Sequence, residues 1–251
     1  MRLYFHQKRQ AGMKAGIITA LPQETKAILK SLQNIEVKSL HGCRFFSGCS
    51  GRSKVSVIES GMGIENAERA AELLVMEDRP DLLISAGLGG GVNSSLATGD
   101  LVLARRILQW REGRLEEIDF VSFPIAPDPA IQFGTFITGG DILNKKKVAT
   151  LLCDGFPFPV LEMESAPIAT VAARHGIPFL GIRAVSDPWD EELLFGIEEF
   201  CDNTLQIRPL KVLVTILHRP WIVPQLIRLA TGSRVAAANL AEVAAMVISR
   251  L

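Results

Sequence analysis

Short apolar runs alternate with segments of helical periodicity along most of this chain, and this alternation constrains the fold more than any other feature. The runs have the length of strands, whereas apolar residues in the segments between them recur at spacings of three and four. Strands that alternate with helices are typical of an α/β domain. The sequence therefore predicts a single α/β domain, with a central mixed β-sheet flanked by helices and a C-terminal helical extension.

The runs and their flanking residues give approximate positions for these elements. The stretch from Leu108 to Ala130 is polar and contains proline, which favours a hairpin or loop over a helix. The expected strands are residues 15–21, 55–59, 81–86, 100–104, 135–138 and 178–185. The expected helices are residues 22–32, residues 64–76 and a long helix that follows Glu164 and ends near Gly176.

Charge and composition exclude several classes of protein. The 27 Lys and Arg residues balance the 27 Asp and Glu residues, which argues against a general nucleic-acid binder. Apolar residues make up 48% of the 251 residues, so the chain can bury a large core without disulfides or metal. The 4 cysteines include no C-x-x-C pair and no histidine at ligand spacing, which predicts reduced thiols in a cytoplasmic protein without a metal or organic cofactor.

The two ends of the chain differ from its middle. Residues 1–13 are basic but contain no apolar signal-peptide core, and we interpret them as a leader. Residues 14–202 form the predicted α/β domain. Residues 203–251 form the predicted basic amphipathic helical extension, and positions 203–241 contain no acidic residue. This extension either packs on the domain or a partner subunit, or touches anionic lipid as a peripheral membrane contact.

Glycines and acidic residues follow the expected strands, where α/β folds place their ligands. Neither Gly61-Met-Gly63 nor the run Gly87–Gly91 completes a dinucleotide-binding fingerprint, because Asn66 and Val92 stand at the final positions. A run of glycines still lets a ligand approach the backbone closely. The candidate site residues at the strand ends are Glu24, Gly87, Leu88, Gly89, Asp141, Glu162, Met163, Glu164, Ser186 and Asp187.

The acidic candidates also have structural interpretations. Glu162 and Glu164 precede a helix, where its dipole favours acidic residues, and carboxylates two positions apart cannot share one helix face. On that basis at most one of them faces the core. Asp187 followed by Pro188 fits a helix N-cap with proline at the first helical position. Spacing alone leaves both interpretations open beside the catalytic one.

Five segments cover most of residues 15–190. They are Gly16-Ile-Ile-Thr-Ala-Leu-Pro-Gln-Glu24, Ser60-Gly-Met-Gly-Ile-Glu-Asn-Ala67, Ile84-Ser-Ala-Gly-Leu-Gly-Gly90 with Gly91 and Thr98-Gly-Asp100, Val160-Leu-Glu-Met-Glu-Ser165, and Pro178-Phe-Leu-Gly-Ile-Arg-Ala-Val-Ser-Asp187. Taken together and in order, these segments resemble the purine nucleoside phosphorylase and uridine phosphorylase superfamily, and their order makes the resemblance specific. Within it they are most similar to the 5′-methylthioadenosine/S-adenosylhomocysteine nucleosidases.

The resemblance implies cleavage of a nucleoside N-glycosidic bond through an oxocarbenium-like ribosyl cation. It implies that Asp187 shares a proton with the purine N7, so that adenine leaves more readily. It also implies that Glu164 binds ribose hydroxyls, that Met163 packs against the sugar and that Glu24 activates the attacking water. An acid that donates this proton must itself be protonated, or be shared with a donor. The resemblance further implies a homo-oligomer that takes a small-molecule nucleoside.

The chain departs from the superfamily pattern at two positions. Leu88 stands where the nucleosidases usually have serine, and Asp141 is displaced by one position from the usual Ser-Gly-Asp segment. Asp141 is therefore also compatible with a simple turn. No arginine lies beside Gly61 or Gly87 to hold phosphate, although Arg44 and Arg52 could reach the site from elsewhere. Hydrolysis is the expected reaction, and phosphorolysis stays open.

The C-terminal segment is similar to the ending of the hopanoid-associated phosphorylases. That resemblance implies a lipid nucleoside, adenosylhopane, as substrate, and a membrane-associated cytoplasmic enzyme. Two alternatives remain beside it, an ordinary 5′-methylthioadenosine/S-adenosylhomocysteine nucleosidase and a non-catalytic protein that binds a nucleoside or lipid.

Overall fold

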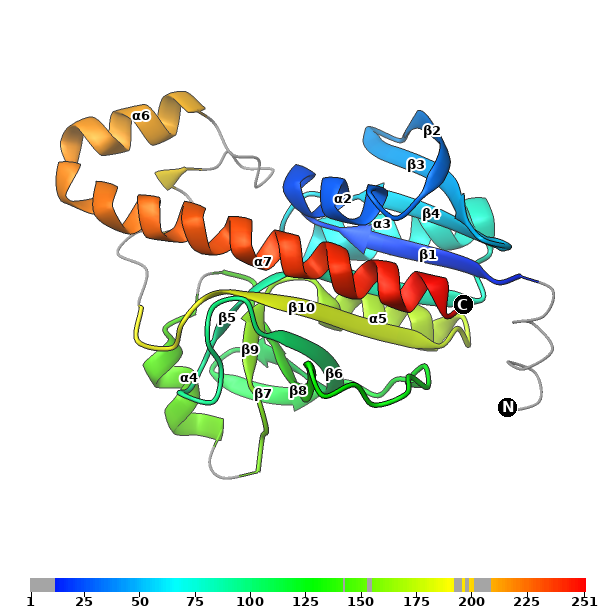
Figure 1. Cartoon of the computed structure of the whole chain (residues 1–251). Coiled ribbons are helices and arrows are strands. Elements are labelled where there is room, and N and C mark those ends of the chain that lie inside the picture. The colour runs from blue at the N-terminus through cyan, green and yellow to red at the C-terminus, as the bar shows by residue number, and fades with distance from the viewer. Residues whose placement is uncertain (1–11, 142, 153–154, 192–195, 197–198, 201–208) are drawn as a thin grey trace.

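The computed structural model describes residues 12–141, 143–152, 155–191, 196, 199–200 and 209–251. Within these residues, a 10-stranded mixed sheet forms the centre of the molecule (Figure 1). The predicted fold class, a single α/β domain with a mixed sheet flanked by helices, is confirmed. Four of its strands lie parallel in the order β4, β1, β5 and β10. They are β1 (Lys14–Thr19), β4 (Ser53–Glu59), β5 (Leu82–Gly91) and β10 (Phe179–Asp187).

Part of the sheet closes into a ring. The strand order β10-β6-β8-β9-β5 is completed by a second pairing between β10 and β5. Closure of this kind removes the free edges that an open sheet would expose. The additional strands are β6 (Leu101–Arg111), β8 (Ile131–Thr138) and β9 (Val160–Glu162), and β7 (Arg114–Glu117) pairs with β6 as a hairpin.

The glycine run continues strand β5 instead of following it. The expected strand at residues 81–86 is observed as Leu82–Gly91, and β9 pairs with Gly90 and Gly91. A Cβ atom at Gly89 would lie 2.8 Å from the carbonyl oxygen of Leu161 and 2.5 Å from Val160 Cγ1. Glycine is therefore required here because β9 crosses so close to the backbone of β5.

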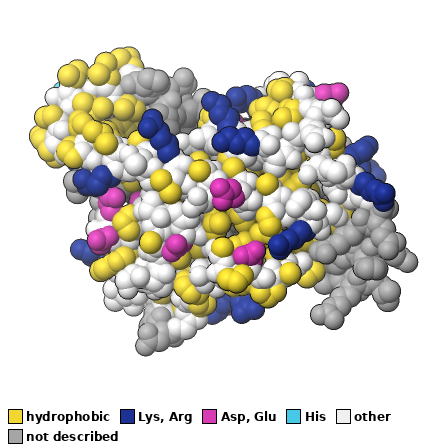
Figure 2. Space-filling model, in the orientation of Figure 1, with side chains coloured by type: hydrophobic (Ala, Val, Ile, Leu, Met, Phe, Trp, Pro, Cys, Tyr) yellow, Lys and Arg dark blue, Asp and Glu magenta, His cyan; other side chains and the backbone are white. Residues whose placement is uncertain are grey.

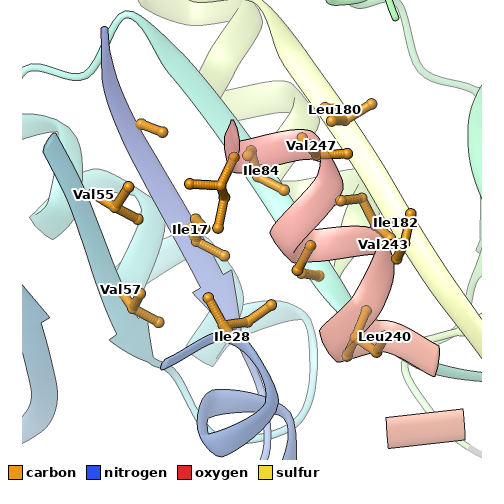
Figure 3. Close-up of a cluster of buried hydrophobic side chains, with 14 of the residues drawn as sticks. Ile17, Ile28, Val55, Val57, Ile84, Leu180, Ile182, Leu240, Val243 and Val247 are labelled. Carbon is orange, nitrogen blue, oxygen red and sulfur yellow. The ribbon is translucent and has the colours of Figure 1, made fainter. Parts of the chain in front are cut away.

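Two layers of helices cover the sheet. Helix α2 (Pro22–Leu29) and helix α7 (Val223–Ser249) share one hydrophobic core with β1 and β10, which Figure 3 shows around Ile17, Ile28 and Val243. A second core joins α3 (Ile64–Asp78) and α5 (Ser165–Arg174), which contact each other. The remaining helical elements are α4 (Lys145–Leu152), α6 (Pro209–His218) and the short 3-10 helix η2 (Pro220–Ile222).

Two surface regions differ from the expected elements. The segment from Leu108 to Ala130 begins inside β6 and includes the hairpin strand β7, and most of the rest is irregular. Strands β2 (Gln33–Leu40) and β3 (Cys43–Ser50) form an antiparallel hairpin to which the sequence pattern assigned no element. Nearly all of β2 is exposed, so it lacks the apolar run that marks a buried strand.

The ends of the chain join the fold at Met13 and α7. Of the predicted leader, residues 1–13, only Gly12 and Met13 are described, and Met13 is buried in the core. The predicted boundary at residues 202 and 203 lies outside the described residues. The C-terminal half of α7 lies against the sheet, where Leu240, Val243 and Val247 are buried between β1 and β10 (Figures 1 and 3).

Candidate active site

The candidate residues gather where the parallel strands β1, β5 and β10 end. Glu24 lies in the first turn of α2, directly after β1, and Asp187 is the last residue of β10. Glu162 ends β9, and Glu164 is the N-cap residue of α5. Glu24 and Asp187 lie at the same edge because the parallel strands β1, β5 and β10 end there. Strand β9 runs antiparallel to β5 and pairs with Gly90 and Gly91, which brings Glu162 and Glu164 to the same region.

Glu24 is buried beneath strand β5. One carboxylate oxygen accepts a hydrogen bond from the backbone N–H of Leu88 at 2.9 Å, and the other accepts from Ala20 and Leu21 at 2.9 and 2.8 Å. A Cβ atom at Gly87 would lie 2.8 Å from the nearer oxygen, so glycine makes room for this carboxylate. Burial raises the pKa of Glu24, while the N–H donors and the charge of Arg183 oppose that rise.

Glu164 reaches from the start of α5 to the loop before α3. Its Oε1 accepts a hydrogen bond from the N–H of Gly63 at 3.0 Å, and Gly63 has a φ of 93°, which favours glycine. Its Oε2 lies 3.7 Å from the guanidinium of Arg183. Burial, and then the nearby charge of Glu162, raises the pKa of Glu164 to about 7. This carboxyl group therefore changes its charge near neutral pH.

Glu162 has a different environment. It pairs with the fully buried Arg183 and accepts hydrogen bonds from the hydroxyl of Thr138 and from the N–H groups of Glu164 and Ser165 at 3.1 and 2.8 Å. Glu162 thus caps α5, as the structural interpretation predicted. The expectation that at most one of Glu162 and Glu164 faces the core is wrong. Both are buried because one ends a strand and the other is the N-cap, so the helix-face rule does not apply to them.

Asp187 is held by hydrogen bonds at both carboxylate oxygens. The hydroxyl of Ser186 donates to Oδ1 at 2.6 Å and lies 3.2 Å from the carbonyl oxygen of Gly89. The ammonium of Lys145, on α4, forms an ion pair with Oδ2. Residues 188–191 form a turn after β10 and no helix begins at Pro188, so the N-cap interpretation of Asp187 is wrong. The end of strand β10 therefore places the acid.

The remaining candidates lie around this centre at different depths. Met163 is partly exposed between Glu162 and Glu164, and the partly buried Leu88 packs against the first hydrophobic core. Asp141 is exposed on the loop after β8, and its role stays a prediction.

Two charged residues of this region were not among the predicted site residues. Arg183 is 1% exposed, and its guanidinium donates to Ser85 Oγ at 3.0 Å besides pairing with Glu162. A single arginine within the apolar run 178–185 was the signal that could have identified it. Lys145 begins α4, where the helix dipole disfavours a cation. This unusual position was a weak signal, because the sequence alone does not show which group pairs with Lys145.

Together these groups can perform acid–base chemistry. They offer a buried carboxylate beneath β5, a carboxyl that titrates near pH 7 and a third carboxyl paired with a cation, and such contrasting environments allow acid and base roles to coexist. Among the described residues, no group of three or more His, Cys, Asp or Glu side chains is arranged to hold a metal ion.

Comparison with known proteins places this chain in a family. Residues 14–218 match the Phosphorylase superfamily, and the chain belongs to it. A 5′-methylthioadenosine/S-adenosylhomocysteine nucleosidase of Exiguobacterium is 28% identical over 236 residues, which cover 82% of this chain and 98% of that protein. A nucleosidase of the same name from Listeria innocua is 27% identical over 215 residues, covering 75% and 92%.

Solved structures share the fold. The 5′-methylthioadenosine/S-adenosylhomocysteine nucleosidase of Neisseria meningitidis, in complex with methylthio-immucillin-A, superposes with a TM-score of 0.70 at 20% identity and covers 95% of this chain and 100% of its own. Futalosine hydrolase of Helicobacter pylori superposes with a TM-score of 0.69 at 17% identity, covering 94% and 97%. The expected superfamily and its fold are therefore confirmed.

Proposed function

We propose that this chain cleaves the N-glycosidic bond of a purine nucleoside with a 5′-substituent and releases adenine. The observation that carries the proposal is the convergence of Glu24, Glu164 and Asp187 from separate elements onto one region of the sheet. Departure of a purine requires an acid for the base, anchors for the sugar and a nucleophile below the ring. Membership of the Phosphorylase superfamily and the nucleosidase names of two relatives support the same reaction.

Each carboxyl group has one role in this reaction. Asp187 shares a proton with the departing base at N7. Glu164, when ionised, accepts hydrogen bonds from the ribose hydroxyls, and Met163 packs against the sugar. Glu24 removes a proton from the attacking water, and a buried carboxylate with a raised pKa is a stronger base than one in water.

Water is the proposed nucleophile, and phosphate is the alternative. Arg44, one of the two arginines that could have held phosphate, forms a two-pronged ion pair with Glu59. Its guanidinium is therefore engaged within the chain. Glu24, by contrast, is buried with a raised pKa, which supports its role as the base that takes a proton from water.

The 5′-substituent has two candidates. The names of the curated relatives favour a small thioether such as that of 5′-methylthioadenosine. A lipid substituent, as in adenosylhopane, is favoured by Leu88 in the glycine run and by the exposed apolar face of α6, on which Leu210 and Leu217 are 72% and 71% exposed. A lipid substituent would also assign a function to the C-terminal segment.

We also propose a cytoplasmic homo-oligomer that touches membranes through the predicted segment 203–241, of which residues 209–241 are described. Figure 2 shows hydrophobic side chains gathered over α6, with Lys and Arg side chains nearby. Basic and apolar side chains on one surface are typical of proteins that bind anionic lipid. Among the described helices, none is long and apolar enough to cross a membrane.

The experiment is a measurement of adenine release by the purified chain, with and without phosphate. The substrates are adenosine, 5′-methylthioadenosine and adenosylhopane in detergent. We expect release without phosphate, a loss of about 100-fold or more in kcat for Asp187→Asn, and a comparable loss for Glu24→Gln. The matched control is Glu65→Gln, an exposed glutamate on α3.

The outcomes separate the candidates. Release from adenosylhopane alone supports the lipid nucleoside, and release from 5′-methylthioadenosine supports the ordinary nucleosidase. Dependence on phosphate, with full activity in Glu24→Gln, would overturn the role of Glu24. Tight nucleoside binding without any release would replace the enzyme by a binding protein.

A further inference from the structure

Lys145 lies in an unfavourable position for a lysine. It is the first residue of α4, where the positive end of the helix dipole repels a cation, and its side chain is only 6% exposed. The next two residues of the chain, Lys146 and Lys147, are exposed. Burial of a single ammonium at this position therefore needs strong compensation from the groups that it contacts.

The compensation comes from the end of strand β10. The ammonium of Lys145 pairs with Oδ2 of Asp187, whose side chain is 11% exposed, and donates to the carbonyl oxygen of Pro188 at 2.6 Å. The carbonyl oxygen of Asp187 lies 3.4 Å from the same nitrogen. These contacts tie the start of α4 to the one carboxyl group that the proposed reaction uses on the base side.

Strand β5 leaves room for this pair. A Cβ atom at Gly90 would lie 2.8 Å from Oδ2 of Asp187 and 3.0 and 3.3 Å from Cε and Nζ of Lys145. Any larger residue at position 90 would displace the ammonium or the carboxylate. The glycine run thus accommodates Glu24 at Gly87 and the pair of Lys145 and Asp187 at Gly90.

We propose that Lys145 is a positioning residue that orients Asp187 and supplies the proton that Asp187 passes to the departing base. This inference rests on the proposed function. An acid on the base side must be protonated or share a proton with a donor. Asp187 has two donors, the hydroxyl of Ser186 at Oδ1 and the ammonium of Lys145 at Oδ2, and the ammonium is the more acidic of the two.

The proton balance of this step is complete. As the N-glycosidic bond breaks, its electron pair moves to the base, and the purine N7 takes a proton from Asp187. Asp187 takes a proton from the ammonium of Lys145, which becomes a neutral amine. Glu24 takes a proton from the attacking water, whose oxygen bonds to the anomeric carbon. Solvent then returns a proton to Lys145 and removes one from Glu24, so no proton is gained or lost overall.

The test compares two leaving groups in the Lys145→Met variant. Adenine needs a proton to leave, whereas 4-nitrophenolate leaves as a stable anion and needs none. We measure kcat and KM for the nucleoside that the unaltered chain cleaves and for a 4-nitrophenyl riboside with the same 5′-substituent. We expect kcat for adenine release to fall by about 100-fold or more and kcat for nitrophenolate release to change by less than about threefold.

Two further variants guard against a folding defect. Lys145→Arg keeps a cation beside Asp187 but cannot give up its proton, so it should keep the thermal unfolding midpoint of the unaltered chain without recovering adenine release. Lys146→Met changes the exposed neighbour on the same helix and should leave both reactions unchanged. Equal losses with both leaving groups would overturn the proposal, because general damage to the site slows both reactions.

Failure of the proposal and failure of the proposed function give different results. Full adenine release by Lys145→Met, together with a large loss in Asp187→Asn, would overturn the role of Lys145 and keep that of Asp187. No cleavage of either substrate class by the unaltered chain would overturn the proposed function, and this inference with it.

Discussion

At the scale of single residues, the environment of Glu164 links stability to pH. An ordinary glutamate loses its proton near pH 4.5, whereas burial and the charge of Glu162 hold the pKa of Glu164 at about 7 in the folded protein. Between these values the unfolded chain has lost the proton and the folded chain keeps it. The folded state therefore binds more protons, and the free energy of unfolding falls as pH rises through this window.

We expect Glu164→Gln to remove this dependence. Relative to the unaltered protein, the stability advantage of the variant should grow as pH rises from 4.5 to 7 and reach roughly 3 kcal/mol above pH 7, from the size of the shift. Urea unfolding of both proteins at pH 5 and pH 8 measures the difference, with Glu65→Gln as the control for loss of one negative charge. A difference in stability that is the same at both pH values would contradict the prediction.

The same residue should appear in the kinetics of the proposed reaction. Ionised Glu164 accepts hydrogen bonds from ribose hydroxyls, so KM should fall as pH rises through about 7 in the unaltered chain. Glu164→Gln should bind the nucleoside more weakly at high pH and lose this dependence. The sequence identified Glu164 as a candidate, but its pKa depends on Glu162 and Arg183, which only the fold brings beside it.

At the scale of elements, one buried ion pair connects β9, α5 and β10. Glu162 caps the first turn of α5 and pairs with Arg183, which projects from the middle of β10. Both side chains are almost completely buried. A charge left alone in such a place cannot be solvated, so loss of one partner is far more costly than loss of an exposed pair.

We expect Glu162→Ala to lower the free energy of unfolding by about 3–5 kcal/mol, because it leaves Arg183 buried without this partner. The matched control is Glu117→Ala, which removes the exposed partner of Arg106 on the β6–β7 hairpin and should cost less than about 1 kcal/mol. Chemical denaturation of both variants measures the two costs. Similar costs for the two variants would show that burial does not determine how much the Glu162–Arg183 pair contributes to stability.

The elements that the sequence predicted were those with strong patterns. The helix over residues 64–76 is observed at Ile64–Asp78, because its apolar spacing matches one buried face. The extension of β5 through Gly91 could not be predicted, since glycine has low strand propensity and the pairing partners of this segment are the distant strands β9 and β10. Strand β2 gave no signal because it is exposed.

At the scale of the whole molecule, α7 joins the core to a projecting apolar surface. Its C-terminal half is buried against the sheet, while α6 projects from the opposite end of α7 and carries hydrophobic side chains on its surface (Figures 1 and 2). The exposed residues of α6 are Leu210, Leu213, Val214 and Leu217. A chain truncated before α6 would lose both parts and expose the first core. The membrane proposal therefore has to be tested with point substitutions on the surface of α6.

We expect the unaltered chain to float with vesicles of phosphatidylcholine and phosphatidylglycerol, and the double variant Leu210→Glu, Leu217→Glu to remain in solution. The new negative charges face anionic lipid and remove apolar contact area at once. Met76→Glu, an equally exposed apolar residue on α3, is the control and should still float. Release of adenine from a water-soluble nucleoside should differ by less than about twofold among the three.

Light scattering on the same three proteins distinguishes lipid from a second copy of the chain. If the double variant has a lower molecular mass than the other two, and none of the three floats, the α6 face is an interface between copies and the membrane proposal is wrong.

The positive charge of this segment is partly balanced within the chain. Arg219 pairs with Glu199, and Arg228 pairs with Glu191.

The sequence by itself determined the fold class, six of the strands and the acidic residues that are candidates for the site. Those features depend on periodicity and on local chemistry, which a linear pattern records. Only the tertiary structure decided that Glu162 pairs with Arg183, that Asp187 is held by Lys145 and that the pKa of Glu164 is raised. Each of these depends on burial and on distances between residues far apart in the chain, and no local pattern contains either quantity.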